Sequence, residues 1–318
     1  MSTEIISLNL NDFKNGNSSQ RTKFVRDLGE AYEKIGFVAI YNHQLSDDTS
    51  ENLYKYTKEF YALPKQIKMK YHKEGIAGQR GLTSWGTEHS KNSSVGDLKE
   101  FYHFGQTIPD ELKSKYDYHQ NILVQEVPDF NTYALKAYAD LQETGKYMLR
   151  AIALYLDLDE FYFDKYIKYG NSILRPIHYG PIKDAPKNAV RAGQHEDINL
   201  ITLLMGASAS GLEVLDKLGN WIAITALPNQ LVVNVGDMLQ RLTNDKLRST
   251  THRVVNPPKE EWGTTRFSIP FFLHPESEMR LDCLENCMTE SNPKKYDDIS
   301  AGEFLTERLI EIGLLDKK

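Results

Sequence analysis

Residues 190–205, with the sequence VRAGQHEDINLITLLM, contain the pattern that decides the fold. Two short runs, Val190 to His195 and Leu200 to Met205, have the length and composition of β-strands and flank the polar triplet His195-Glu196-Asp197. Similar runs lie on both sides of this stretch, at Ser172 to Tyr179, Leu212 to Leu215, Trp221 to Ile224, Leu231 to Val235, Thr250 to Val255 and Phe267 to Leu273. About eight strands in roughly a hundred residues, separated by turns, predict an antiparallel sandwich or jelly roll.

The first 165 residues have a different pattern, with apolar residues mostly at helical spacing. The expected elements are a strand at Ile5 to Leu10, a helix ending at Gly36, a strand at Gly36 to Tyr41, a helix capped by Ser46 or Asp47 and ending near Pro64, and a long helix at Pro128 to Tyr155. We therefore expect a mostly helical portion at residues 1–165 that packs on the barrel, a jelly-roll core at residues 166–280, and a C-terminal segment at residues 281–318. That last segment contains a helix near Ala301 to Ile312.

Composition and charge argue against several classes of function. The 318 residues include 38 Lys and Arg against 44 Asp and Glu, a formal charge of -6, so there is no basic excess to neutralise nucleic acid. Cys283 and Cys287 are too few for a disulfide framework, and they lack the second pair that a structural zinc site needs. With neither a signal-like N-terminus nor a long apolar stretch, the chain is expected to be cytoplasmic, away from the membrane, with thiols that stay free.

A candidate metal site follows from the polar triplet. His195 and Asp197 are two residues apart and share a face if the segment is extended, so both can reach one metal. His252 lies 57 residues later in another predicted strand and can supply the third ligand. Two imidazoles and one carboxylate on one side of a metal are typical of non-haem Fe(II) and leave positions open for substrates and oxygen. A His-x-Asp pair alone also occurs in solvated loops and in packed cores.

A candidate anion site follows 14 residues after His252. Arg266 and Ser268 alternate with Phe267, so they project a guanidinium and a hydroxyl from one strand face. Arg binds a carboxylate through two parallel hydrogen bonds and keeps its charge in a dry pocket. The alternative is a surface salt bridge beside a neighbouring Ser. The apolar run from Phe267 to Leu273 favours the inward, anion-binding interpretation.

These motifs together resemble the isopenicillin N synthase-like branch of the Fe(II)/2-oxoglutarate dioxygenases. The similar stretches are His195-Glu196-Asp197, Asn199 to Leu204, Gly211 to Val214, Asn234 to Gln240, His252-Arg253-Val254 and Arg266 to Phe272. The resemblance extends to Ile35-Gly36-Phe37 and Asp97 to Phe101 in the N-terminal portion. It implies a double-stranded β-helix, Fe(II) at His195, Asp197 and His252, and a co-substrate carboxylate at Arg266 and Ser268.

The resemblance also assigns a role to Tyr179. Plant flavonoid-type members have Asn-x-Tyr before the His-x-Asp, whereas this chain has Ile177-His178-Tyr179. The phenol of Tyr179 is therefore expected to contact the distal carboxylate, while a contact through the Asn has no counterpart. His178 alternates with Tyr179 and is expected to face away from the metal.

The implied function is a dioxygenase that uses Fe(II), 2-oxoglutarate and O2 to oxidise, and most simply hydroxylate, a small metabolite with release of succinate and CO2. One alternative is an isopenicillin N synthase-type oxidase, in which Arg266 and Ser268 bind the carboxylate of the substrate and no 2-oxoglutarate is consumed. Another is a non-catalytic metal-binding sensor. Around the site, His274 is expected at the rim. Possible substrate contacts are Arg80, Trp85, Tyr102 and His103.

Overall fold

The computed structural model describes residues 5–88, 96–116, 118–182, 190–206, 211–224, 227, 229–311 and 314–315. Its strands are β1 (Ser7–Asn9), β2 (Phe37–Tyr41), β3 (Gly81–Thr83), β4 (Glu100–Gly105), β5 (Ile173–Leu174), β6 (Ile177–Tyr179), β7 (Ala192–His195), β8 (Ile201–Met205), β9 (Leu212–Leu215), β10 (Trp221–Ala223), β11 (Leu231–Val235), β12 (His252–Val254) and β13 (Arg266–Leu273). Its helices are α1 (Leu10–Lys14), α2 (Ser18–Lys34), α3 (Asp47–Ala62), α4 (Lys65–Lys68), α5 (Pro128–Tyr155), α6 (Asp164–Ile167), α7 (Asp237–Leu242) and α8 (Ala301–Glu311), with short 3-10 turns at 69–71, 110–112, 259–261 and 285–287.

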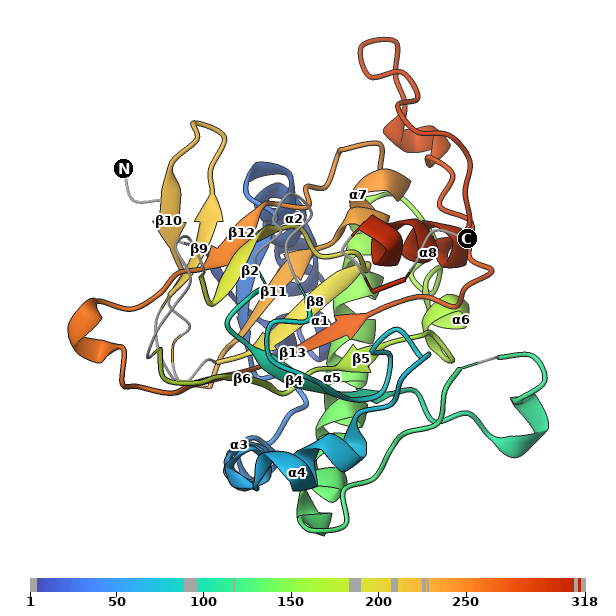
Figure 1. Cartoon of the computed structure of the whole chain (residues 1–318). Coiled ribbons are helices and arrows are strands. Elements are labelled where there is room, and N and C mark those ends of the chain that lie inside the picture. Colours follow the sequence, from blue (N-terminus) through green and yellow to red (C-terminus); the bar gives the residue numbers. More distant parts are fainter. Residues whose placement is uncertain are drawn as a thin grey trace.

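The strands form two sheets that position the site. The larger has nine strands in the order β1-β2-β11-β8-β13-β5-β4-β3, with β6 beside β13 and β4. The smaller has four, in the order β10-β9-β12-β7. Figure 1 shows this mainly β core with helices around it. The predicted fold class, a jelly-roll core with flanking helices, is confirmed.

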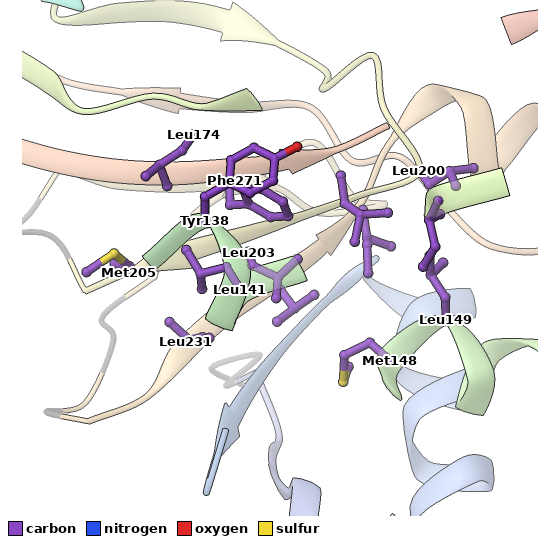
Figure 2. Packing of buried hydrophobic residues seen from close by; sticks show 14 of the residues in the cluster. Tyr138, Leu141, Met148, Leu149, Leu174, Leu200, Leu203, Met205, Leu231 and Phe271 are labelled. Atoms are coloured by element: carbon purple, nitrogen blue, oxygen red, sulfur yellow. The ribbon is translucent and has the colours of Figure 1, made fainter. Parts of the chain in front are cut away.

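The long helix α5 packs against the larger sheet and forms the main core. Pro128 begins the helix, where its missing N–H costs no hydrogen bond, and apolar residues recur at helical spacing along it. Figure 2 shows Tyr138, Leu141, Met148 and Leu149 of α5 among sheet residues that include Leu203 and Phe271. At Gly145 a Cβ atom would lie 2.3 Å from Leu273 Cδ1, so glycine lets α5 approach β13 closely.

Most predicted elements match the structure within a residue or two. Ser46 caps α3 by accepting the Thr49 N–H, and α5 has the predicted bounds. The run from Ser172 to Tyr179 is divided into β5 and β6 by Arg175-Pro176, because proline has no N–H to donate within a ladder. The last predicted helix corresponds to α8, and Ile312 lies outside the described residues.

The N-terminal portion contributes more strand than its sequence pattern indicates. β3 and β4 were not expected, yet β4 pairs with β5 and β6 and is buried along its whole length. The described helices include none that is long and apolar enough to cross a membrane. Cys283 and Cys287 are buried free thiols, as expected.

Candidate metal centre and active-site cavities

The three predicted ligands converge at the end of the smaller sheet. β12 pairs with β7 so that His252 lies directly opposite His195, with ring centroids 4.4 Å apart. Asp197 follows the end of β7, and its Oδ1 lies 4.0 Å from His195 Nε2 and 3.7 Å from His252 Nε2. One ligand atom from each residue lies within 4.8 Å of the other two. This is the donor set of an Fe(II) site with open positions.

Backbone carbonyls orient both imidazoles. His195 Nδ1 lies 2.7 Å from the Gly193 carbonyl oxygen, and His252 Nδ1 lies 3.0 Å from that of Thr250. A carbonyl oxygen only accepts, so each Nδ1 carries the hydrogen and each Nε2 keeps its lone pair. Burial, followed by the charge of His252, lowers the pKa of His195 to about 4. The His195 ring is therefore neutral at neutral pH, as metal binding requires.

Two residues that sequence reasoning missed orient the carboxylate. Asp197 Oδ2 accepts hydrogen bonds from Thr202 Oγ1 at 2.7 Å and from Asn234 Nδ2 at 2.8 Å. Thr202 and Asn234 lie opposite each other on β8 and β11. The one feature of the sequence that could have identified these two residues is that each is a single polar residue inside an apolar run.

The environment of Asp197 keeps its carboxylate ionised. Burial raises the pKa of Asp197, but the nearby His252 and His195, together with the two hydrogen bonds on Oδ2, outweigh burial and hold it below its usual value. The side chain is thus a charged ligand with Oδ1 facing the two imidazoles.

The predicted anion-binding residues line a cavity beside the triad, here called the lower cavity. Arg266 on β13 lies opposite Tyr179 on β6, with its guanidinium carbon 4.8 Å from the Tyr179 ring centroid. Arg266, Ser268 and Tyr179 are at most 3% exposed and share this cavity with His195 and Asp197. The structure therefore brings together all six predicted site residues.

His178 faces away from the metal site, as expected. Its Nδ1 lies 2.8 Å from Glu100 Oε1, and its ring stacks on Phe267 with centroids 5.1 Å apart. Lys68 donates to the same Glu100 oxygen at 2.6 Å. His178 therefore belongs to a packed polar cluster with Glu100 and Lys68.

A second space of about 310 Å³, the upper cavity, also adjoins His195 and Asp197. Charged side chains on its walls pair with one another. Lys99 Nζ lies 2.9 Å from Asp97 Oδ2, Arg175 Nη1 lies 3.3 Å from Glu88 Oε2, and Arg308 Nη2 lies 2.7 Å from Glu311 Oε1. Leu305 and Leu309 of α8 also line this space, and Arg175 and Phe272 reach both cavities.

The residues expected near the mouth have different positions. His103 lines the upper cavity, where its Nε2 accepts a 2.6 Å hydrogen bond from Arg175 Nε. Arg80, Trp85 and Tyr102 are not among the described residues that line either cavity. The rim position expected for His274 is wrong: its side chain is 7% exposed and lines the upper cavity, because it continues the inward alternation of β13.

Two family models match separate parts of this chain. A family model for the N-terminal region of the non-haem dioxygenases in morphine synthesis matches residues 5–126, and that of the 2OG-Fe(II) oxygenase superfamily matches residues 170–275. A proline hydroxylase from Petromyces alliaceus is 31% identical over 97% of this chain and 99% of its own.

Solved structures agree with the family models. A protein from Caulobacter crescentus assigned to the 2OG-Fe(II) oxygenase family superimposes with a TM-score of 0.86 at 40% identity, covering 98% of this chain and 100% of its own. A full-length Neurospora crassa protein in complex with alpha-KG and thymine superimposes with a TM-score of 0.84 at 29% identity, and the match covers 96% of each chain. The chain therefore belongs to the 2OG-Fe(II) oxygenase superfamily, the non-haem dioxygenases that use Fe(II), 2-oxoglutarate and O2.

Proposed function

We propose that His195, Asp197 and His252 hold the Fe(II) of this dioxygenase. The observation that carries this assignment is the convergence of two Nε2 atoms and Oδ1, each fixed by a hydrogen bond to the other polar atom of its side chain. When bound, Fe(II) supplies the reaction of O2 with 2-oxoglutarate that yields succinate and CO2 and oxidises a substrate C–H bond. The chain supplies the ligands, their orientation and a site with restricted access to water.

Arg266, Ser268 and Tyr179 are the proposed contacts of the distal carboxylate of 2-oxoglutarate. Their burial in one cavity with the metal ligands supports this assignment, because a desolvated guanidinium and two hydroxyls match a carboxylate. The upper cavity then remains for the primary substrate. Two spaces that both reach His195 and Asp197 suit a co-substrate in one and a substrate in the other, rather than a single substrate bound through Arg266.

The proposed reaction is hydroxylation of a small metabolite. The name of the proline hydroxylase relative gives a substrate of this class. Cytoplasmic action, without nucleic-acid or membrane partners, is part of the same proposal. The net charge of -6 and the two free cysteines support it.

The decisive experiment measures O2 uptake, succinate and 2-oxoglutarate consumption for the Fe(II)-loaded protein and its Asp197→Ala variant. We expect matched succinate and 2-oxoglutarate turnover in the wild type, and loss of both in the variant while its fold is retained. Full turnover in the Asp197→Ala variant would refute the ligand assignment. O2 uptake with a substrate but without succinate would instead indicate the isopenicillin N synthase-type reaction.

A further inference from the structure

His195 belongs to the edge strand of the smaller sheet. In the order β10-β9-β12-β7, β7 comes last and pairs with β12. The partners of Ala192 and His195 are two residues apart on β12, whereas Ala192 and His195 are three apart, so β7 has one extra residue. Such a β-bulge leaves one residue outside the ladder and bends the strand. Gly193 lies in this bulge, two residues before the proposed metal ligand.

The backbone of Gly193 forms hydrogen bonds with two side chains. Its N–H donates to Asp97 Oδ1 at 3.0 Å, and its carbonyl oxygen accepts from His195 Nδ1 at 2.7 Å. Glycine has the largest backbone freedom of all residues, so the direction of this carbonyl depends on contacts from outside the strand. Asp97 supplies such a contact. A second bond joins the same two segments, from the Leu98 N–H to the Val190 carbonyl at 3.0 Å.

Buried ion pairs fix the position of Asp97. Its side chain is in a residue that is 7% exposed, and Lys99 Nζ lies 2.9 Å from its Oδ2. The same ammonium lies 3.7 Å from Glu88 Oε1, and Arg175 Nη1 lies 3.3 Å from Glu88 Oε2. Two carboxylates and two cations balance in charge, and buried charges are stable only when they are paired. This arrangement directs Oδ1 of Asp97 to the Gly193 N–H.

We propose that Asp97 is a positioning residue for the metal centre, which acts through Gly193 to orient the imidazole of His195. The inference rests on the proposed function, because it takes His195 as an Fe(II) ligand. It extends the metal centre to the N-terminal portion of the chain, since Asp97 lies just before β4 and outside the jelly-roll core. The alternative is that Asp97 only stabilises the fold by attaching this segment to the edge of the sheet.

The first test is an anaerobic Fe(II) titration of Asp97→Ala against a competing chelator. Substitutions of groups that orient metal ligands typically cost about 10- to 100-fold in metal affinity, and because Asp97 acts through one further residue we expect a loss of about fivefold. The matched control is Asn121→Ala, since Asn121 Oδ1 also accepts a glycine N–H, that of Gly105 at 2.7 Å. It should lower the melting temperature but leave the Fe(II) affinity unchanged. Wild-type affinity in Asp97→Ala, or an equal loss in the control, would overturn the proposal.

The second test reports on the geometry of the site, which a purely structural role would not change. The visible absorption bands of bound Co(II) depend on the arrangement of its ligands, so Asp97→Ala should shift them and Asn121→Ala should not. In the metal-free protein, nitrogen NMR should find the His195 proton on Nδ1 in the wild type and on both nitrogens in Asp97→Ala. Asp97→Asn keeps an oxygen for the Gly193 N–H and should recover part of both effects. Wild-type bands and tautomer in Asp97→Ala would overturn the proposal.

Two further measurements separate the possible failures. If Asp97→Ala does not fold, hydrogen exchange of the wild type still tests the contact: the Gly193 amide should exchange as slowly as the paired amides of β12, and fast exchange would overturn the proposal. A wild type that binds no Fe(II), or a His195→Ala variant with wild-type affinity, refutes the proposed function and this inference with it. Loss of the metal in His195→Ala but not in Asp97→Ala refutes only the inference.

Discussion

Replacing Thr202 by Val tests how the structure orients the carboxylate ligand. The two side chains have nearly the same shape, so the change removes one donor from Asp197 Oδ2, at 2.7 Å, and leaves the Asn234 donor at 2.8 Å. Asn199 Nδ2 loses its 3.1 Å contact with the hydroxyl but keeps the Ile201 carbonyl at 2.8 Å. The effect should therefore appear in metal affinity more than in the fold.

The expected magnitude follows from the charge of the acceptor. A hydrogen bond to an ionised group is worth about 1.5–3 kcal/mol, and about 1.4 kcal/mol corresponds to a factor of ten. Because one donor remains, we expect the lower end of that range and a loss of Fe(II) affinity of roughly tenfold. Substitutions of residues that hydrogen-bond to metal ligands typically cost about 10- to 100-fold.

The assay is an anaerobic Fe(II) titration in competition with a chelator of known affinity. The matched control is Thr57→Val in α3, because Thr57 is fully buried and its hydroxyl has no partner among the described residues. That variant should bind Fe(II) like the wild type. If Thr202→Val also binds Fe(II) within about twofold of the wild type, the hydrogen bonds on Oδ2 do not position Asp197 for the metal.

Three further predictions concern charge and metal. Arg266→Lys keeps the charge but loses the guanidinium fork, so calorimetry should show roughly tenfold weaker 2-oxoglutarate binding with little change in melting temperature; the reverse order would indicate a structural salt bridge. Burial raises the pKa of Glu88, but Arg175 and Lys99 outweigh it and lower the pKa from 4.5 to about 2. The ionised carboxylate should therefore add about 3 kcal/mol to the free energy of unfolding above pH 4.5, and this stabilisation should be lost as the pH falls towards 2. Glu88→Gln should lower the urea midpoint at pH 7 and remove this pH dependence. An unchanged midpoint would contradict a stabilising role of the ion pairs. Removal of the metal by a chelator should lower the melting temperature. Fe(II) at about 100 times its Kd should add back about 2.7 kcal/mol to the free energy of unfolding of the wild type, and an equal response in Asp197→Ala would count against the metal site.

The metal ligands could be predicted because their signal is local. His195 and Asp197 are two residues apart at the end of a short predicted strand, and His252 lies in another β-rich run. The pairing of β7 with β12 then places His252 opposite His195. Arg266 and Ser268 follow the same logic, since strand alternation alone places both on one face.

Thr202 and Asn234 could not be assigned in this way. Each is one polar residue in an apolar run, and its role depends on the β8–β11 register, which brings the two together at Oδ2 of Asp197. β4 was missed for a related reason. Its sequence, Glu100 to Gly105, mixes charged and aromatic residues, and it is buried only because β5 and β6 pair with it from a distant part of the chain.

His274 differs from both cases because its neighbours in the sequence favour a position that the structure does not show. The run before it ends a buried strand, and Pro275 follows, so an exposed rim position is the simplest interpretation of the sequence. Its burial arises where the chain continues past Leu273 beside Ser172, whose hydroxyl accepts the His274 N–H, and where α8 closes the same cavity with Leu305 and Leu309. The alternation that directs Phe272 inward therefore directs His274 inward as well. A polar residue that follows the apolar run of a strand, and that stays on the inward face of its alternation, can therefore line a cavity even where the sequence suggests an exposed position.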